Sequence, residues 1–277
     1  FPVISDPNNH HEVPMIVTRP LLGLKNWLGL RTLYMREIRR FSKVYIQTIL
    51  APVITTLVFL AIFTLAIGKL RGDINGVPFI EFLAPGLIMM AIIQNSFANA
   101  ASSIMAAKMQ GNIIDTLMPP LTANELVLAY ASGGATRGIV VGCAVGLAVS
   151  LFVDMHVNNL LLIIFYAATA SYMLAMVGII GGVWANRQDH MTVINGFIIT
   201  PLSFLSGTFY SIDRMPENLQ FFALINPFFY AIDGLRTGFT GQSDGPLLFG
   251  AVFLVVIDTI LWMICWRMFA TGYKLKP

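Results

Sequence analysis

The segment Phe204–Arg236, FLSGTFYSIDRMPENLQFFALINPFFYAIDGLR, changes character twice along its length. It begins as the apolar end of a helix, becomes polar after Ser211, and is apolar again from Leu219 to Ile232. A helix needs about 20 predominantly apolar residues to cross the hydrocarbon core of a bilayer. The second apolar part is too short for this, so it requires another explanation.

Two prolines divide this segment into short helices. Pro216 followed by Glu217 is typical of a helix start, because proline suits the first turn and an acidic side chain complements the helix dipole there. Asn226-Pro227 then breaks the apolar part in two. We expect a re-entrant helical hairpin over residues 213–237. Irregular backbone at membrane depth is tolerated where protein buries it or it lines a cavity, so the hairpin should cap or gate a passage.

The composition of the whole chain points to a membrane protein. Of the 277 residues, 56% are hydrophobic and 11% are charged, whereas about 25% charged residues are usual in a soluble domain. Six uncharged or nearly uncharged runs are long enough to be spans, namely 44–68, 82–107, 126–153, 160–186, 191–212 and 245–266. The sequence therefore predicts an all-α polytopic membrane protein with six transmembrane helices over 44–277. A flexible tail is expected over 1–20.

The distribution of basic residues predicts the orientation. With the N-terminus in the cytoplasm, most of the 17 Lys and Arg lie on the inner side, and Lys69, Arg71, Arg214 and Arg236 face outward. Short cytoplasmic loops are enriched in Lys and Arg, so both termini are predicted to be cytoplasmic. The net charge of +3 then reflects topology and not a nucleic-acid partner.

Residues 21–43, before the first span, contain an amphipathic helix that we expect to lie on the inner leaflet. Its apolar residues follow helical spacing along one face, and its basic residues are predicted to gather on the opposite face. The apolar set is Trp27, Leu30, Leu33, Tyr34, Ile38 and Phe41, and the basic set is Arg36, Arg39, Arg40 and Lys43. Two interpretations stay open: an anchor held by anionic lipid, or an anchor that also receives a partner protein.

Two spans carry glycines at steps of four residues. The third span has Gly134, Gly138, Gly142 and Gly146, and the fourth repeats the spacing once at Gly178 and Gly182. Such spacing lets another helix approach closely, backbone to backbone. The approaching helix can belong to this chain or to a second copy, and packing within the chain is the simpler interpretation.

Two ionisable residues fall inside spans. A centrally placed Arg or Asp costs about 2.5–3.5 kcal/mol on insertion scales, so Arg137 and Asp258 each need an explanation. We expect Arg137 to lie toward the cytoplasmic end of its helix, where snorkelling or pairing gives it a structural role. Asp258, near the middle of its span, is either protonated or hydrogen-bonded within the bundle, or it is a proton-coupling site.

The chain lacks the common motifs of nucleotide-binding and hydrolytic enzymes. It contains no G-x-x-x-x-G-K-[ST], no H-E-x-x-H and no G-x-S-x-G. Cys143 and Cys265 both fall in apolar runs without the spacing of a zinc site. The sequence therefore predicts neither an enzyme, nor a metal site, nor a cofactor held by this chain.

The order of these parts resembles the permease subunits of bacterial type 2 ABC exporters. The resemblance rests on Tyr34-Met-Arg-Glu-Ile-Arg-Arg-Phe41, on six spans, on Phe204-Leu-Ser-Gly-Thr-Phe-Tyr210 with Met215-Pro216, and on Asn226-Pro227-Phe228. It implies an inner-membrane half-permease that dimerises with a second copy and binds two cytoplasmic ABC ATPase subunits. ATP and Mg would be bound by those ATPase subunits.

The resemblance also implies roles for particular residues. Contacts to the ATPase would come from Arg36, Glu37, Arg39, Asn112, Asp115, Arg187 and Asp189. An amphipathic cargo, such as a lipid, glycan or drug, would pass along a seam lined by Asn95, Phe97, Asn99, Phe197, Phe204 and Phe209, with Pro216, Asn226 and Pro227 shaping the outer hairpin.

Two other functions compete with this one. A secondary transporter would couple ion movement to Asp258 and would work without an ATPase. A channel with half-helices would use an Asn-Pro-Phe segment, but such channels contain two of them in an inverted repeat. Here Asn226-Pro227-Phe228 has no counterpart in the first half of the chain.

Overall fold

The computed structural model describes residues 26–66, 74, 76–113, 121–211 and 217–275. Helices make up nearly all of this part, and its one β-type contact is an isolated antiparallel bridge between Ile74 and Val77. The predicted all-α class is therefore confirmed. The predicted tail 1–20, Asp115 and Pro216 lie outside the described residues.

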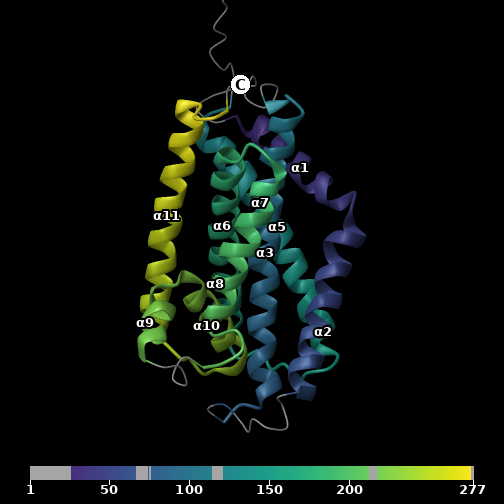
Figure 1. Cartoon of the computed structure of the whole chain (residues 1–277), viewed down its shortest axis with the longest axis vertical. Coiled ribbons are helices and arrows are strands. Elements are labelled where there is room, and N and C mark those ends of the chain that lie inside the picture. Colours follow the sequence, from purple (N-terminus) through teal and green to yellow (C-terminus); the bar gives the residue numbers. More distant parts are fainter. Residues whose placement is uncertain (1–25, 67–73, 75, 114–120, 212–216, 276–277) are drawn as a thin grey trace, which may run out of the picture.

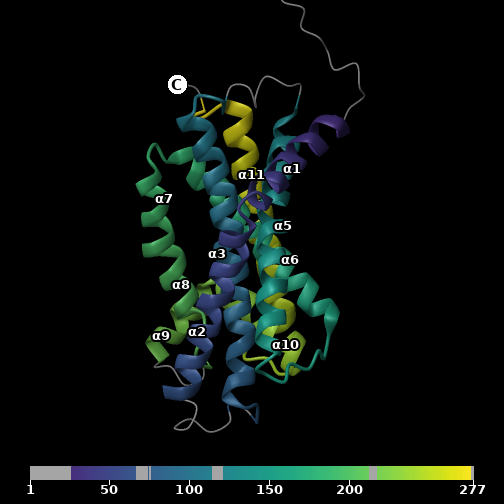
Figure 2. The same cartoon turned by 90° about the vertical axis from the view of Figure 1, so that its right-hand side faces the viewer.

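Five helices in the described part are long and apolar enough to cross a membrane. They are a continuous run Ile46–Ala66, which joins a π-helical stretch η1 (Ile46–Leu50) to α2 (Ala51–Ala66), together with α3 (Phe79–Met109), α5 (Ala123–Ser150), α6 (Leu160–Trp184) and α11 (Leu247–Thr271). Each overlaps a run that the sequence predicts as a span. Figures 1 and 2 show them running along the long axis of the molecule.

The predicted span 191–212 is less regular than the others. It is occupied by α7 (Gln188–Ile194), a π-helical stretch η2 (Asn195–Ile199) and α8 (Thr200–Leu205), which follow one another without a gap. Pro201 has no backbone N–H to donate to the preceding turn, and a π-helical stretch lies just before it. This run is not one of the five long apolar helices, and its first turn contains the polar residues Gln188, Asp189 and His190.

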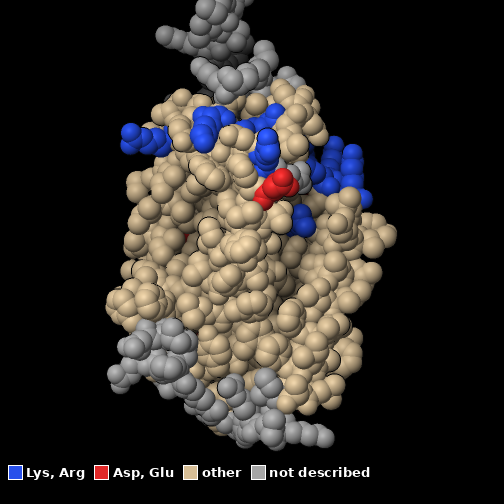
Figure 3. All heavy atoms as spheres, in the orientation of Figure 1, with Lys and Arg blue, Asp and Glu red and all other residues tan. Residues whose placement is uncertain are grey.

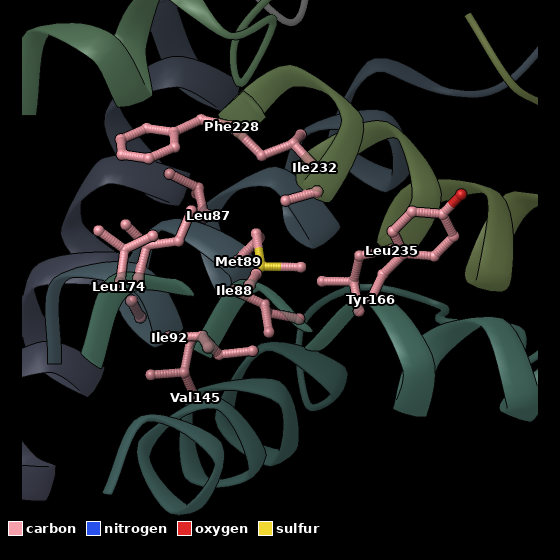
Figure 4. Packing of buried hydrophobic residues seen from close by; sticks show 14 of the residues in the cluster. Leu87, Ile88, Met89, Ile92, Val145, Tyr166, Leu174, Phe228, Ile232 and Leu235 are labelled. Carbon is pink, nitrogen blue, oxygen red and sulfur yellow. The ribbon is translucent and has the colours of Figure 1, made fainter. Parts of the chain in front are cut away.

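Helix α3 is the centre of the bundle. It packs against α6 and α5 along its length, while α2 and α11 stand at opposite sides of the molecule (Figure 1). In the close view, Leu87 and Met89 of α3 lie between Phe228 of α10 on one side and Val145 of α5 on the other (Figure 4). Most of the apolar core is therefore built around this single helix.

The predicted glycine faces of α5 and α6 both pack against α3 of the same chain. A Cβ atom added at Gly138 of α5 would lie 2.8 Å from the backbone oxygen of Ile92, and one at Gly178 of α6 would lie 2.5 Å from that of Phe97. Gly182 is almost as crowded, with 2.9 Å to the backbone oxygen of Ala101. Packing within the chain is thus confirmed for these glycines.

Where the sequence predicts the re-entrant hairpin 213–237, the described residues form two short helices, α9 (Glu217–Ile225) and α10 (Pro227–Thr240). They separate at Asn226, as predicted, where the side-chain Oδ1 accepts a hydrogen bond from the Phe228 N–H at 3.1 Å. The Asn226 amide also donates to the Leu202 carbonyl at 2.9 Å and to Ser206 Oγ at 2.7 Å. The break between the two helices is therefore fixed to the end of α8.

On the face that Figure 3 shows, the Lys and Arg side chains of the described residues gather at one end of the molecule. Figure 3 shows Lys and Arg of the described residues near the end that carries α1 (Trp27–Ser42) and the C-terminus, and almost no charge across the broad middle of that face. A belt without charges is what a hydrocarbon environment requires of a protein surface.

Candidate functional site

A polar cavity lies between the first membrane helix and the centre of the bundle. It has a volume of about 590 Å³ and is lined from α1, η1, α2, α3 and α5. Its polar lining residues include Arg40, Gln47, Thr55, Gln94, Asn95 and Arg137. Such a group of polar side chains at membrane depth marks a functional site, because each would be costly against lipid.

The polar lining follows from the sequence of the first membrane helix. Thr48, Pro52, Thr55, Thr56 and Phe59 recur at helical spacing, and all five line the cavity. None of these five residues was predicted from the sequence as part of a site, although hydroxyl groups on one face of an otherwise apolar helix are a readable signal.

Arg137 projects into the cavity from the middle of α5. The expectation that it lies toward the cytoplasmic end is wrong, because α5 begins at Ala123 and ends at Ser150. Its Nη2 donates to Asn95 Oδ1 at 3.3 Å, so the predicted pairing exists, with an amide as the partner. The Arg137 Nε is buried without a hydrogen-bond partner among the described residues.

Arg40 reaches the same cavity from α1 and is held by α3. Its Nη2 donates to the Asn99 carbonyl at 2.7 Å and to Asn99 Oδ1 at 2.8 Å, and its Nη1 donates to Ser102 Oγ at 3.0 Å. It also forms an ion pair with Glu37, with 3.3 Å between Nη2 and Oε2. These contacts attach α1 to the central helix.

Glu37 is 1% exposed, and this corrects its assignment as an ATPase contact. Ser103 Oγ donates to its Oε1 at 2.8 Å, and Arg36 and Arg40 lie on either side of it. A carboxylate enclosed in this way positions α1 and has no surface to offer a partner. Tyr34 adds a hydrogen bond to Thr136 of α5 at 2.9 Å, so α1 packs against the bundle.

The predicted separation of α1 into an apolar and a basic face is therefore only partly right. Leu33 and Phe41 are buried, as expected. Arg40, however, turns toward α3, and Arg36 donates to Tyr130 Oη at 3.0 Å. Hydrogen-bond partners on other helices decide these orientations, and helical spacing within α1 carries no information about them.

Five of the predicted ATPase contacts are exposed residues. They are Arg36 and Arg39 of α1, Asn112 after α3, Arg187 before α7, and Asp189 in the first turn of α7. The helix ends that carry them lie at the same end of the molecule (Figures 1 and 2). Their role in ATPase contact stays a prediction.

The structure does not bring the predicted cargo seam together as one lining. Asn95 lines the polar cavity, whereas Asn99 is fully buried and holds Arg40. Phe97 is 2% exposed and lines a different, smaller cavity together with Met191 and Asn195. Phe197 is 79% exposed and points away from the bundle. The predicted seam grouped these residues together, although their side chains face different parts of the bundle.

Phe204 and Phe209 instead join an aromatic cluster with the first membrane helix. The Phe209 ring stacks on Phe63 with 4.4 Å between centroids and lies 5.3 Å from Phe204. Phe59, 6.5 Å from Phe209, also lines the polar cavity. The cluster therefore borders the cavity and connects α2 to the end of α8.

Asp258 lies away from this site. It belongs to α11, on the side of the molecule opposite α2 (Figure 1), and does not line the polar cavity. Its Oδ1 is buried without a hydrogen-bond partner among the described residues.

Comparison with known proteins identifies the family. The ABC-2 type transporter family matches residues 29–240, which contain α1 from its first turn, the polar cavity, α9 and α10. The chain belongs to the ABC-2 type transporter family. This ABC-2 protein is 35% identical to the inner membrane transport permease YadH of Escherichia coli K12 over 250 residues, 90% of this chain and 98% of that protein.

A more distant relative is nodulation protein J of Rhizobium leguminosarum bv. viciae. It is 26% identical over 231 residues, which cover 82% of this chain and 86% of the relative. The resemblance read from the sequence is thus confirmed at the level of the family. This ABC-2 protein is a membrane transport permease by these similarities and by its apolar helices.

Proposed function

We propose that this ABC-2 protein is the transmembrane subunit of an ABC exporter in a bacterial inner membrane. The run α7–η2–α8 would serve as a sixth span beside the five long helices, with α9 and α10 as a re-entrant hairpin at the outer face. Both termini would be cytoplasmic. The gathering of Lys and Arg at the end with α1 supports this orientation.

The observation that carries the proposal is the attachment of α1 to α3 through Arg40. Arg36 and Arg39 are exposed on α1, at the same end as Arg187 and Asp189. A partner that pushes on this surface would move α3 with α1, because Arg40 is hydrogen-bonded to Asn99 and Ser102. Helix α3 forms one wall of the polar cavity, so the motion would change the cavity.

The motor would be a pair of cytoplasmic ABC ATPase subunits, and the complete permease would contain a second copy of this chain. ATP and Mg would be held by those ATPase subunits. Closure of the ATPase pair would shift the two permease halves about their common seam, which is a rigid-body transition of a familiar type. An amphipathic lipid, glycan or drug suits a route with a polar cavity bordered by the aromatic cluster.

Co-expression with a candidate ABC ATPase from the same organism tests this function. Charge reversal at Asp189 or Arg39, written Asp189→Arg and Arg39→Glu, should reduce co-purification of the ATPase and its hydrolysis in proteoliposomes about tenfold or more, the cost of losing one or two charged contacts. Asp154→Arg is the matched control. Asp154 is exposed and follows the C-terminal end of α5, away from the end of the molecule that carries Arg39 and Asp189. Full gradient-driven transport by the isolated chain would contradict the proposal.

A further inference from the structure

The polar cavity is positively charged. Arg40 and Arg137 line it, and no Asp or Glu belongs to its lining among the described residues. Glu37 pairs with Arg40, but it also lies beside Arg36, so one carboxylate is shared by two guanidinium groups. Arg137 has no ion pair within the described part of the chain. The cavity therefore keeps an uncompensated positive charge.

A charge of this kind is costly at membrane depth unless a partner compensates it. Arg137 has only the neutral Asn95 amide as a hydrogen-bond acceptor, and its Nε has no partner among the described residues. The cost of an uncompensated charge is high in a medium of low dielectric constant. A negatively charged ligand in the cavity would remove this cost.

The hydrogen-bond donors around the cavity suit an oxyanion. A guanidinium group is planar and matches phosphate or carboxylate with two parallel hydrogen bonds. Gln47, Gln94, Thr48 and Thr55 add amide and hydroxyl groups to the same lining. The volume of about 590 Å³ is enough for a headgroup with part of its linker.

An apolar cavity flanks the same helix. It has a volume of about 570 Å³ and is lined by apolar side chains and Thr64. Its residues Ile54, Val58 and Ala61 belong to α2 and differ from those of α2 that line the polar cavity. The two sides of α2 thus offer one environment for a charged group and one for an acyl chain.

We propose that the polar cavity binds the anionic headgroup, a phosphate or a carboxylate, of the amphiphile that this permease moves. Arg137 is the principal contact, Arg40 contributes a second positive charge, and Gln94 donates through its amide. The inference rests on the proposed transport of an amphipathic cargo and narrows it to anionic amphiphiles.

The test is a binding measurement on the full chain in nanodiscs of phosphatidylcholine. Dodecyl phosphate is the anionic probe and dodecyl maltoside is the neutral one, and both are titrated by calorimetry. Arg137→Gln should weaken the binding of dodecyl phosphate about tenfold or more, as loss of a charge-assisted hydrogen bond predicts, and leave that of dodecyl maltoside unchanged. Arg137→Lys, which keeps the charge, should restore part of the affinity.

Two further variants serve as a control and as a substitute for Arg137→Gln. Arg267→Gln removes an exposed arginine of α11 and should leave both affinities unchanged. If Arg137→Gln fails to fold, Gln94→Leu replaces it and should weaken dodecyl phosphate about threefold, the effect of one neutral hydrogen bond. Equal affinities of the wild type and the folded variants for dodecyl phosphate would overturn the inference, as would dodecyl maltoside binding as tightly as dodecyl phosphate.

Competition with inorganic phosphate distinguishes a site for the free anion from a site for the headgroup of an amphiphile. Displacement of dodecyl phosphate by millimolar inorganic phosphate would show that the site recognises the anion itself, and lack of displacement would show that the alkyl chain is required; either result keeps the site. ATPase association is measured on the same preparations. If dodecyl phosphate binding depends on Arg137 but no ATPase associates, the proposed function is wrong and the anion site stands. If an ATPase associates but dodecyl phosphate binding does not depend on Arg137, the proposed function stands and the anion site is wrong.

Discussion

Arg236 is the most completely enclosed basic side chain among the described residues, at 3% exposed. Its Nε donates to the Phe82 carbonyl at 3.1 Å, its Nη2 donates to the Gly207 carbonyl at 2.8 Å, and Nη1 lies 3.7 Å from Asp244 Oδ2. The guanidinium also stacks over the Phe82 ring at 3.7 Å. One side chain therefore joins α10, α3 and the segment after α8.

Replacement of Arg236 should destabilise the protein strongly. In Arg236→Met, two carbonyl groups each lose a hydrogen bond and the Asp244 carboxylate loses this ion pair, and breaking a buried ion pair costs about 3–5 kcal/mol. We expect the midpoint of thermal unfolding in detergent to fall by several degrees. Arg267→Met is the control, because Arg267 is exposed and should leave the midpoint nearly unchanged. The same midpoint for both variants would contradict this account of Arg236.

At the scale of elements, the central helix α3 packs closely against the glycines of α5 and α6. Gly138→Ala should therefore be harmful, because its Cβ would lie 2.8 Å from the Ile92 backbone oxygen, which cannot move without shifting α3. Overpacking of this kind costs about 1–3 kcal/mol. Gly146→Ala is matched in helix and substitution, yet the nearest atom, Ile88 Cδ1, is 3.7 Å away. Thermal unfolding should separate the two variants, and equal midpoints would rule out close α3–α5 packing.

The same elements show how far the sequence alone could predict this structure. Glycine spacing predicted a close helix contact, and Asn226-Pro227 predicted a helix break, because both signals are local. The sequence could not reveal that Glu37 is buried, since its partner Ser103 lies 66 positions along the chain. The cavity was missed for a related reason: Arg40 and Arg137 come from separate helices and meet only after these pack around α3.

At the scale of the whole molecule, the axis of the bundle should be the membrane normal. The loop between α5 and α6, with His156, and the loop between α6 and α7, with Arg187, are both exposed and lie at opposite ends of α6. In a variant without Cys143 and Cys265, single cysteines His156→Cys and Arg187→Cys report which side each end faces. A membrane-impermeant maleimide should label His156→Cys in intact cells and Arg187→Cys only in inverted vesicles, because basic loops stay cytoplasmic. The reverse pattern would invert the orientation and place α1 away from any cytoplasmic motor, and labelling of both from one side would show that α6 does not cross.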